Sequence, residues 1–475
     1  MRSRLQQGLA GGGGPRQPGT AAPEKPATAA PPADPVWAAH LHNPLRKLAF
    51  GCAIVYIFLR ISLLHELIAF KLDIATRVLY VVGTPALLGA FFTGGIGRTM
   101  RSRVAWAWLA FTIWMSLCVF SSSWRGGSTT TVLTWLRSEF SPLFLLAGLV
   151  LTWRELRLLF AAIAVGMGVV LWTASGFSRL AGGRFALDYA GSIANPNDLA
   201  AHLLMASGIL LYFVLRPNQK LAIRLLGLGM IAMTLSIVVN TGSRGAVVAI
   251  GAMLVTYALV GPRRWVVIAA GMVLMTVAFL FSTGAGRQRL LTAVSNDQPA
   301  DIEAEAAGSQ EDRIFLLKEG VRITLQHPVF GVGPGEFTDA EGARRLAAGI
   351  PGLWLVSHNS FTEVSSETGL PGIAFYLGAI VGTFVLLERI RRHARQDPRH
   401  AFIVSAAVSL QLSLVTFGTA AFFLTLGYRF YFPVISGLAI ALYGAYRNDI
   451  LVASGPATPA GARKGAMGSA AMRRL

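Results

Sequence analysis

Apolar segments of membrane-spanning length follow one another along most of this chain, and they constrain its fold more than any other feature. A helix needs about 20 residues to cross roughly 30 Å of hydrocarbon. The segments lie at 45–64, 75–96, 104–122, 131–152, 156–175, 198–215, 221–240, 244–261, 265–283, 359–387, 401–424 and 429–446. Only 14% of the 475 residues are charged, whereas soluble domains carry about 25%. The sequence therefore predicts an all-α integral membrane protein with about twelve transmembrane helices.

The distribution of basic residues predicts the orientation of these helices. If the N-terminus is cytoplasmic, 26 of the 42 Lys and Arg residues fall in inside segments and 14 in outside segments, while Arg60 and Arg137 lie within spans. Because cytoplasmic segments of membrane proteins are enriched in Lys and Arg, we expect both termini in the cytoplasm. The formal net charge of +19 then reflects topology, and it does not indicate nucleic-acid binding.

Composition divides the chain into five parts. Residues 1–43 and 448–475 are rich in Gly, Pro and Ala, which predicts disordered cytoplasmic tails. Residues 44–283 hold helices 1–9 and residues 358–447 hold helices 10–12. Residues 284–357 form a long outside loop, and loops of this length are usually functional.

The long loop has a helical pattern of its own. From Glu311 to Gln326 we expect a helix whose apolar face is formed by Ile314, Leu317, Val321 and Leu325. His327 and Pro328 should end that helix, and a glycine-rich turn follows.

Common cofactor and metal motifs are missing from the sequence. There is no CxxC, HExxH, Walker loop or GxGxxG, and Cys52 and Cys118 both lie in apolar stretches. ATP hydrolysis, dinucleotide chemistry and thiolate zinc binding therefore have no visible support. We expect neither a metal nor a cofactor.

The outer start of the eighth span is a candidate anion site. Ser243 and Arg244 lie there, on the side where basic residues are disfavoured. A helix N-terminus offers unpaired N–H groups, and a guanidinium binds two phosphate oxygens at once. The alternative is an interfacial arginine whose side chain reaches water.

Two arginines of the loop helix are further candidates. Arg313 and Arg322 are nine residues apart, which places them on opposite faces of a straight helix. Arg313 is the better candidate because it lies near the N-terminal end. Ordinary surface charge on an amphipathic helix is the alternative.

A histidine joins the loop to the tenth span. His358 could act as a general base at neutral pH, with Asn359 and Glu363 beside it as substrate-binding candidates. Helix capping by Asn359, or by Ser360 with Glu363, explains the same residues without catalysis.

Two other positions complete the candidate set. Asn195 precedes the sixth span, where capping is a sufficient explanation. Arg137 and Glu139 lie within the fourth span, point to different sides and require other partners. Pro142 should free the carbonyl of Ser138 and produce a local kink.

Taken together and in order, several motifs resemble those of the bacterial O-antigen ligase and polymerase superfamily, over roughly residues 190–390. The motifs are Asn195-Pro196-Asn197, Gly242-Ser243-Arg244-Gly245, Arg313 followed by His327-Pro328-Val329-Phe330-Gly331-Val332-Gly333-Pro334-Gly335, and His358-Asn359-Ser360-Phe361 followed by Glu363 and Glu367-Thr368-Gly369-Leu370-Pro371-Gly372.

This resemblance implies a metal-independent glycosyltransferase on the periplasmic face of the bacterial inner membrane. It would transfer a glycan from undecaprenyl diphosphate to a sugar hydroxyl of a lipid-linked or lipid A–core acceptor. By the same resemblance, Arg244 and Arg313 would hold the diphosphate and His358 would activate the acceptor hydroxyl. A flippase and a chain-length regulator are possible partners.

Alternatives stay open at this point. Polymerase and ligase share these motifs, and protein O-oligosaccharyltransferases have the same chemistry. A transporter or flippase would place ionisable residues at the membrane midplane, where Arg137 and Glu139 are the available support. A metal-dependent transferase of another fold would use acidic residues such as Glu66 and Asp73 in the first outside loop.

Overall fold

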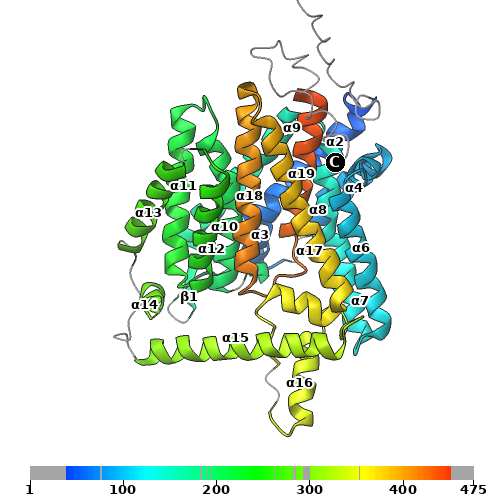
Figure 1. Ribbon diagram of the computed structural model, residues 1–475, viewed down its shortest axis with the longest axis vertical. Helices are drawn as coiled ribbons and strands as arrows, with labels where there is room; N and C mark the ends of the chain where they lie inside the picture. Colours follow the sequence, from blue (N-terminus) through cyan, green and yellow to red (C-terminus); the bar gives the residue numbers. More distant parts are fainter. Residues whose placement is uncertain are drawn as a thin grey trace, which may run out of the picture.

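The computed structural model describes residues 39–74, 77–181, 184–189, 191–193, 195–262, 264–280, 282, 285–292, 300–351 and 354–450. Within these ranges the chain is a helical bundle with one small hairpin (Figure 1). The predicted tails fall largely outside these ranges, since the described part begins at residue 39 and ends at residue 450.

Each predicted apolar segment coincides with a helix or with a group of helices in the bundle. The bundle helices are α2 (Pro44–Ser62), α4 (Val78–Phe92), α6 (Arg103–Cys118), α7 (Arg125–Thr134), α8 (Ser141–Leu149), α9 (Trp153–Gly176), α10 (Pro196–Leu215), α11 (Leu221–Asn240), α12 (Arg244–Val260), α13 (Arg264–Leu280), α17 (Ser360–Ala394), α18 (Ala401–Ala421) and α19 (Tyr431–Ala445). Shorter elements are α3 (Leu64–Leu72), α5 (Gly95–Thr99), and the antiparallel strands β1 (Ser178–Ala181) and β2 (Arg184–Leu187).

The chain is a multi-pass membrane protein, and part of the predicted span count is established. Among the described residues, six helices are long and apolar enough to cross a membrane. Helices α2 and α3 are bent by 69° at a short break between them. If the two form one broken span, they add a seventh candidate span. Helices α4, α12 and α13 are apolar but shorter. Twelve spans stay a prediction.

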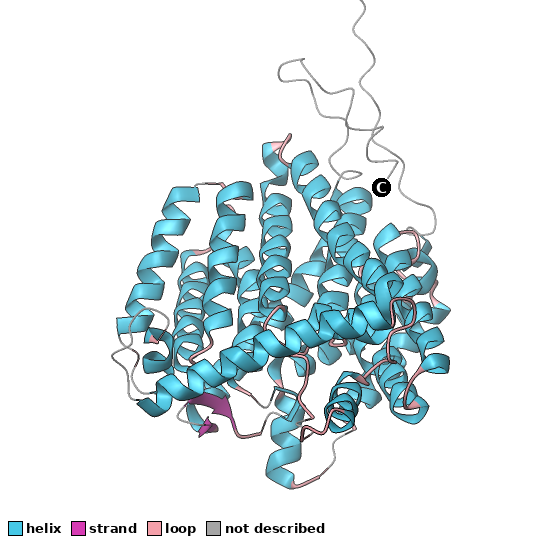
Figure 2. Cartoon of the chain, turned by 60° about the horizontal axis from the view of Figure 1, so that its bottom comes forward, coloured by secondary structure: helices cyan, strands magenta, loops and turns pink. Residues whose placement is uncertain are grey.

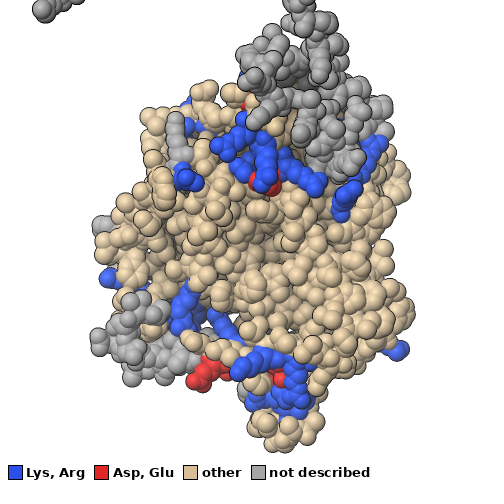
Figure 3. All heavy atoms as spheres, viewed as in Figure 1, with Lys and Arg blue, Asp and Glu red and all other residues tan. Residues whose placement is uncertain are grey.

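The bundle surface has the character expected for contact with lipid. On the face that Figure 3 shows, most Lys and Arg lie toward the two ends, with a broad band between them that is almost free of both. Large apolar side chains are exposed on the helices, for example Trp172 at 70%, Val81 at 68% and Leu259 at 77%. Soluble proteins rarely expose extended apolar surface of this kind.

The fourth predicted segment is broken by a π-helical turn, Trp135–Phe140, between α7 and α8. This turn lies just before Pro142, and the Tyr56 hydroxyl donates to the carbonyl oxygen of Ser138, the carbonyl that Pro142 was expected to free, at 3.1 Å. The buried Glu139 carboxylate accepts from Arg60 of α2 at 2.7 Å and from the backbone N–H of Phe430 at 2.8 Å. Arg60 is therefore held inside the first bundle helix by a partner from the fourth segment.

The long loop is helical and covers one end of the bundle, hereafter called the loop end. Its helices are α14 (Ala285–Leu291), α15 (Ala300–Gln326) and α16 (Phe337–Ala347). Helix α15 lies across the ends of the bundle helices (Figures 1 and 2) and packs on α17. It ends at Gln326, before His327 and Pro328 as predicted, but begins eleven residues earlier than predicted.

The apolar stripe predicted on α15 is present, but it is not the face that packs against the rest of the protein. Ile314, Leu317, Val321 and Leu325 are 41–69% exposed, whereas Leu316 and Ile323 are buried against the rest of the protein. Leu316 and Ile323 pack with Val332 of the following turn and Phe337 of α16. Apolar residues occur on more than one side of this helix, so periodicity identified one stripe while tertiary packing buried another.

The glycine-rich turn after α15 docks on a break in α17. At Gly369 the backbone is left-handed (φ 69°), and a Cβ there would collide with the carbonyl oxygen of Val329. The carboxylate of Glu367 accepts from the backbone N–H groups of Gly335 at 2.6 Å and Phe337 at 3.1 Å. The glycine-rich turn and the Glu367–Gly369 segment therefore fix the loop helices to the bundle.

Candidate active site

Three arginines from three different elements gather at the loop end. Arg244 is the first residue of α12, Arg289 lies on α14, and Arg313 lies on α15. Burial and the neighbouring guanidinium groups of Arg289 and Arg244 lower the pKa of Arg313. We call Arg244, Arg289 and Arg313 the arginine cluster.

Local structure presents Arg244 at this end. Gly242 takes a left-handed conformation (φ 62°) that turns the chain from α11 into α12. The Ser243 side chain caps α12 by accepting from the backbone N–H of Ala246 at 3.3 Å. Ser243 thus precedes Arg244 as a helix cap, which is the arrangement predicted for an anion site.

The guanidinium of Arg184 on β2 ties this turn to α10. Its Nε donates to the carbonyl oxygen of Thr241 at 2.8 Å, and its Nη2 donates to Asn197 Oδ1 at 2.8 Å. The hairpin therefore holds the starts of α10 and α12 in a fixed relation beside the arginine cluster.

A small pocket lies next to Arg313. Its polar lining consists of Asn197, Ser243 and Arg313, and its apolar walls include Phe423 and Leu424. We call it the basic pocket. A guanidinium beside a capped helix N-terminus in a partly apolar cleft suits a phosphate group, because low polarity strengthens the charge–charge attraction.

His358 stands beside this cluster. Its backbone is left-handed (φ 51°), which is uncommon for a residue with a Cβ, and its N–H donates to Thr425 Oγ1 at 2.9 Å. Burial first, and then the positive charge of Arg313, lower the pKa of His358, while Asp312 acts in the opposite direction. The imidazole is therefore neutral near pH 7 and able to accept a proton.

Three other predicted site residues have structural contacts in the same region. Asn359 caps α17 by accepting from the backbone N–H groups of Phe361 and Thr362, and Asn195 caps α10 in the same manner. The Glu363 carboxylate is buried and accepts from the backbone N–H of Gly427 at 2.9 Å. It supports the loop that presents Thr425 to His358.

Two predicted residues lie away from the arginine cluster. Arg322 is exposed and lies 4.0 Å from Glu319, consistent with the expected opposite faces of α15. The exposed guanidinium of Arg137 lies over the ring of Tyr80, 4.9 Å from its centroid. Both were candidates because of sequence position, and helix geometry separates them from the site.

Sequence reasoning missed Arg289 and Arg184. Both belong to the basic residues that fall outside in the predicted topology, which is the signal that could have identified them. Arg289 is 6% exposed, so it is a buried cation and not a surface charge.

In the ranges that the structure describes, no group of three or more His, Cys, Asp or Glu side chains could hold a metal ion. Glu66, a candidate of the metal-dependent alternative, instead accepts from the backbone N–H of Ser192 at 3.1 Å.

Part of the chain is similar to a known protein family. Residues 229–377 match a family model described as O-antigen ligase, which confirms the resemblance to the O-antigen ligase and polymerase superfamily. The matched range contains the arginine cluster and His358. No curated protein matches the chain. The family supports a membrane glycosyl-transfer role in polysaccharide assembly.

Proposed function

We propose that this protein transfers a glycan from undecaprenyl diphosphate to a sugar hydroxyl of a lipid-linked or lipid A–core acceptor, at the periplasmic face of the bacterial inner membrane. The observation that carries the proposal is the arginine cluster beside a neutral His358, within the family-matched range. The cluster suits the diphosphate and the imidazole suits the hydroxyl.

The proposed reaction is a single displacement at the anomeric carbon. The acceptor oxygen forms a bond to that carbon while the bond to the diphosphate oxygen breaks, and the leaving diphosphate keeps the electron pair. Arg244 and Arg313 stabilise the charge that grows on the leaving group, as preorganised donors do in other transferases. His358 takes the hydroxyl proton, and inversion at the anomeric carbon follows.

The proposed role of His358 predicts a specific pH dependence. Because the pKa of His358 lies below its ordinary 6.5, the acid limb of kcat/KM should lie below that pH. Arg313→Gln removes a positive neighbour, raises the pKa and should move the limb of the residual activity to higher pH. Asp312→Asn removes a negative neighbour and should move it to lower pH. If the acid limb of kcat/KM lies at the same pH in the wild type, in Arg313→Gln and in Asp312→Asn, the role of His358 as base is contradicted.

The function itself is tested by the glycan profile of a deletion strain. The strain is complemented with the wild-type protein, with His358→Ala, or with His327→Ala, which changes an exposed histidine of the same loop. We expect His327→Ala to restore the profile and His358→Ala to fail, since a general base contributes about 10²–10⁴-fold.

The form of the defect identifies the acceptor. Single repeat units on the acceptor indicate a lost polymerase, and unattached long chains on the lipid carrier indicate a lost ligase. Loss of glycoproteins alone would replace the proposed acceptor by a protein. Retention of lipid-linked glycan on the cytoplasmic side would indicate a flippase and overturn the proposal.

A further inference from the structure

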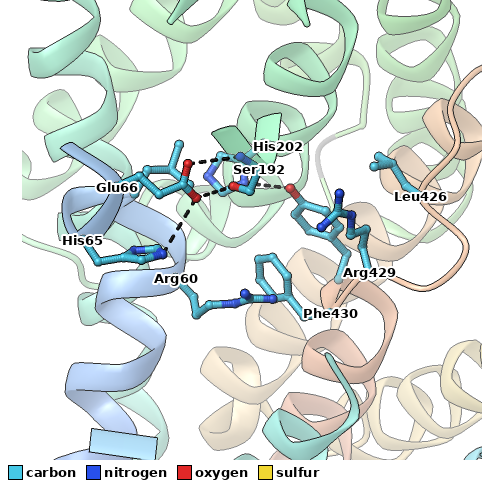
Figure 4. Close-up of a pocket in the computed structure, with 10 residues that line it drawn as sticks. Arg60, His65, Glu66, Ser192, His202, Leu426, Arg429 and Phe430 are labelled. Carbon is cyan, nitrogen blue, oxygen red and sulfur yellow. Dashed lines mark hydrogen bonds and ion pairs between the residues drawn. The ribbon is translucent and has the colours of Figure 1, made fainter. Parts of the chain in front are cut away.

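A second pocket lies at the loop end between the N-terminal helices and the loop before α19 (Figure 4). Its polar lining comes from four separate segments of the chain. These residues are Arg60, His65, Glu66, Ser192, His202 and Arg429. We call it the polar pocket. The proposed reaction assigns it no role so far.

The polar pocket has unused hydrogen-bonding capacity. The Glu66 carboxylate accepts from the N–H and the hydroxyl of Ser192 and lies 3.8 Å from Nε2 of His65, whereas a carboxylate has about four acceptor positions. In the described part of the chain the exposed Arg429 guanidinium donates no hydrogen bond. Acceptors and donors therefore face the same space.

Other side chains form a rigid wall. His202 uses both ring nitrogens inside the protein, at 3.1 Å from the Tyr431 hydroxyl and 2.9 Å from the carbonyl oxygen of Ile61. Arg60 is paired with Glu139 and lies over the ring of Phe430. We therefore assign ligand contacts to Glu66, Ser192 and Arg429 and a supporting role to the wall.

The polar pocket and the basic pocket differ in the charge of the side chains around them. In the polar pocket Arg60 is balanced by Glu139, and Arg429 interacts with Asp198. The arginine cluster instead brings three guanidinium groups together. A balanced set of donors and acceptors suits neutral hydroxyl groups, whereas the cluster suits an anion.

One short segment links the two pockets. Leu424 lines the basic pocket and Leu426 lines the polar pocket. Thr425, between them, accepts the hydrogen bond from the backbone N–H of His358. The backbone of His358, the residue that takes the hydroxyl proton in the proposed reaction, is thus held by the segment that contributes to both pockets.

We propose that the polar pocket binds a sugar unit of the acceptor glycan through Glu66, Ser192 and Arg429. This inference rests on the proposed function. Leu424 and Leu426, two residues apart, line the basic pocket and the polar pocket respectively, so a glycan in the polar pocket lies next to the proposed diphosphate site. The shared chemistry of the possible acceptors is a neutral, hydroxyl-rich sugar.

The test measures transfer by the full-length protein in nanodiscs, with lipid-linked glycan from the source organism as donor. Two acceptor probes are offered separately: the same lipid-linked glycan, and the lipid A–core of that organism. Glu66→Gln and Ser192→Ala are compared with the wild type. Asp397→Asn serves as the matched control, because it removes a carboxylate near the opposite end of α17.

We expect each pocket variant to raise the KM for one acceptor about 10-fold, the effect of one lost hydrogen bond of about 1.4 kcal/mol. The donor KM and the kcat at saturating acceptor should stay within about twofold of wild type. The probe whose KM rises identifies the acceptor. A structural defect would lower kcat for both substrates instead, and Asp397→Asn should change none of these values.

Two results would overturn the assignment. The first is an unchanged acceptor KM in both variants while the wild type transfers glycan. The second is a rise in the donor KM, which would place the donor sugar in the polar pocket. Failure of the wild type to transfer at all would refute the proposed function itself, so the two failures are distinguishable.

Discussion

Replacing Arg313 with alanine should lower the rate of glycan transfer by about 10²–10³-fold, the usual effect of removing one preorganised donor from a developing negative charge. Arg313 is partly buried and lines the basic pocket, so water cannot fully replace its guanidinium. Transfer is measured at saturating donor and acceptor with purified protein. Arg313→Lys keeps the charge but loses the two-pronged geometry, and it should recover part of the activity.

Lys318→Ala is the matched control for this prediction. Lys318 is an exposed cation on the same helix, so its loss changes the net charge of α15 by the same amount. Activity close to wild type in Lys318→Ala, together with the loss in Arg313→Ala, assigns the effect to the site. Equal losses in both variants would mean that only the overall charge of the loop end matters.

Replacing Arg60 with alanine should destabilise the fold by about 3–5 kcal/mol, because it leaves the Glu139 carboxylate buried without its cation. Glu139 is 5% exposed and lies 2.7 Å from Arg60. Its remaining partner among the described residues is the backbone N–H of Phe430. Thermal unfolding of the purified protein in detergent measures the loss.

Two comparisons test the cause of that destabilisation. Arg60→Met combined with Glu139→Leu removes both charges, and it should recover most of the stability. Arg137→Ala removes an exposed arginine only two residues from Glu139 and should have a small effect. A double variant as unstable as Arg60→Ala would show that packing, and not the unpaired charge, is responsible.

Much of the fold could be predicted from the sequence because a bilayer sets strict limits on a chain. A segment that crosses hydrocarbon must be long, apolar and helical, so each apolar segment coincided with helical structure. Pro142 predicted a local irregularity in the fourth segment, and a π-helical turn lies just before it. The partner of Glu139 was not predicted, since Arg60 is 79 residues away in the sequence.

The candidate site was predicted in part. Arg244, Arg313 and His358 were chosen because of helix position, charge on an unfavoured side and family resemblance, and the structure brings them together. Arg289 and Arg184 were not chosen, because nothing in their local sequence distinguishes them from other outside basic residues. Their importance depends on where α14 and the hairpin pack.

The sequence by itself determined the class of the protein, the positions of its helices and the residue types available for the proposed diphosphate chemistry. These follow from local composition and periodicity, which act over one helix at a time. The tertiary structure decided which face of α15 is buried, which arginines form one cluster and which polar residues line a second pocket. Those outcomes depend on contacts between residues far apart in the chain, and no local pattern records them.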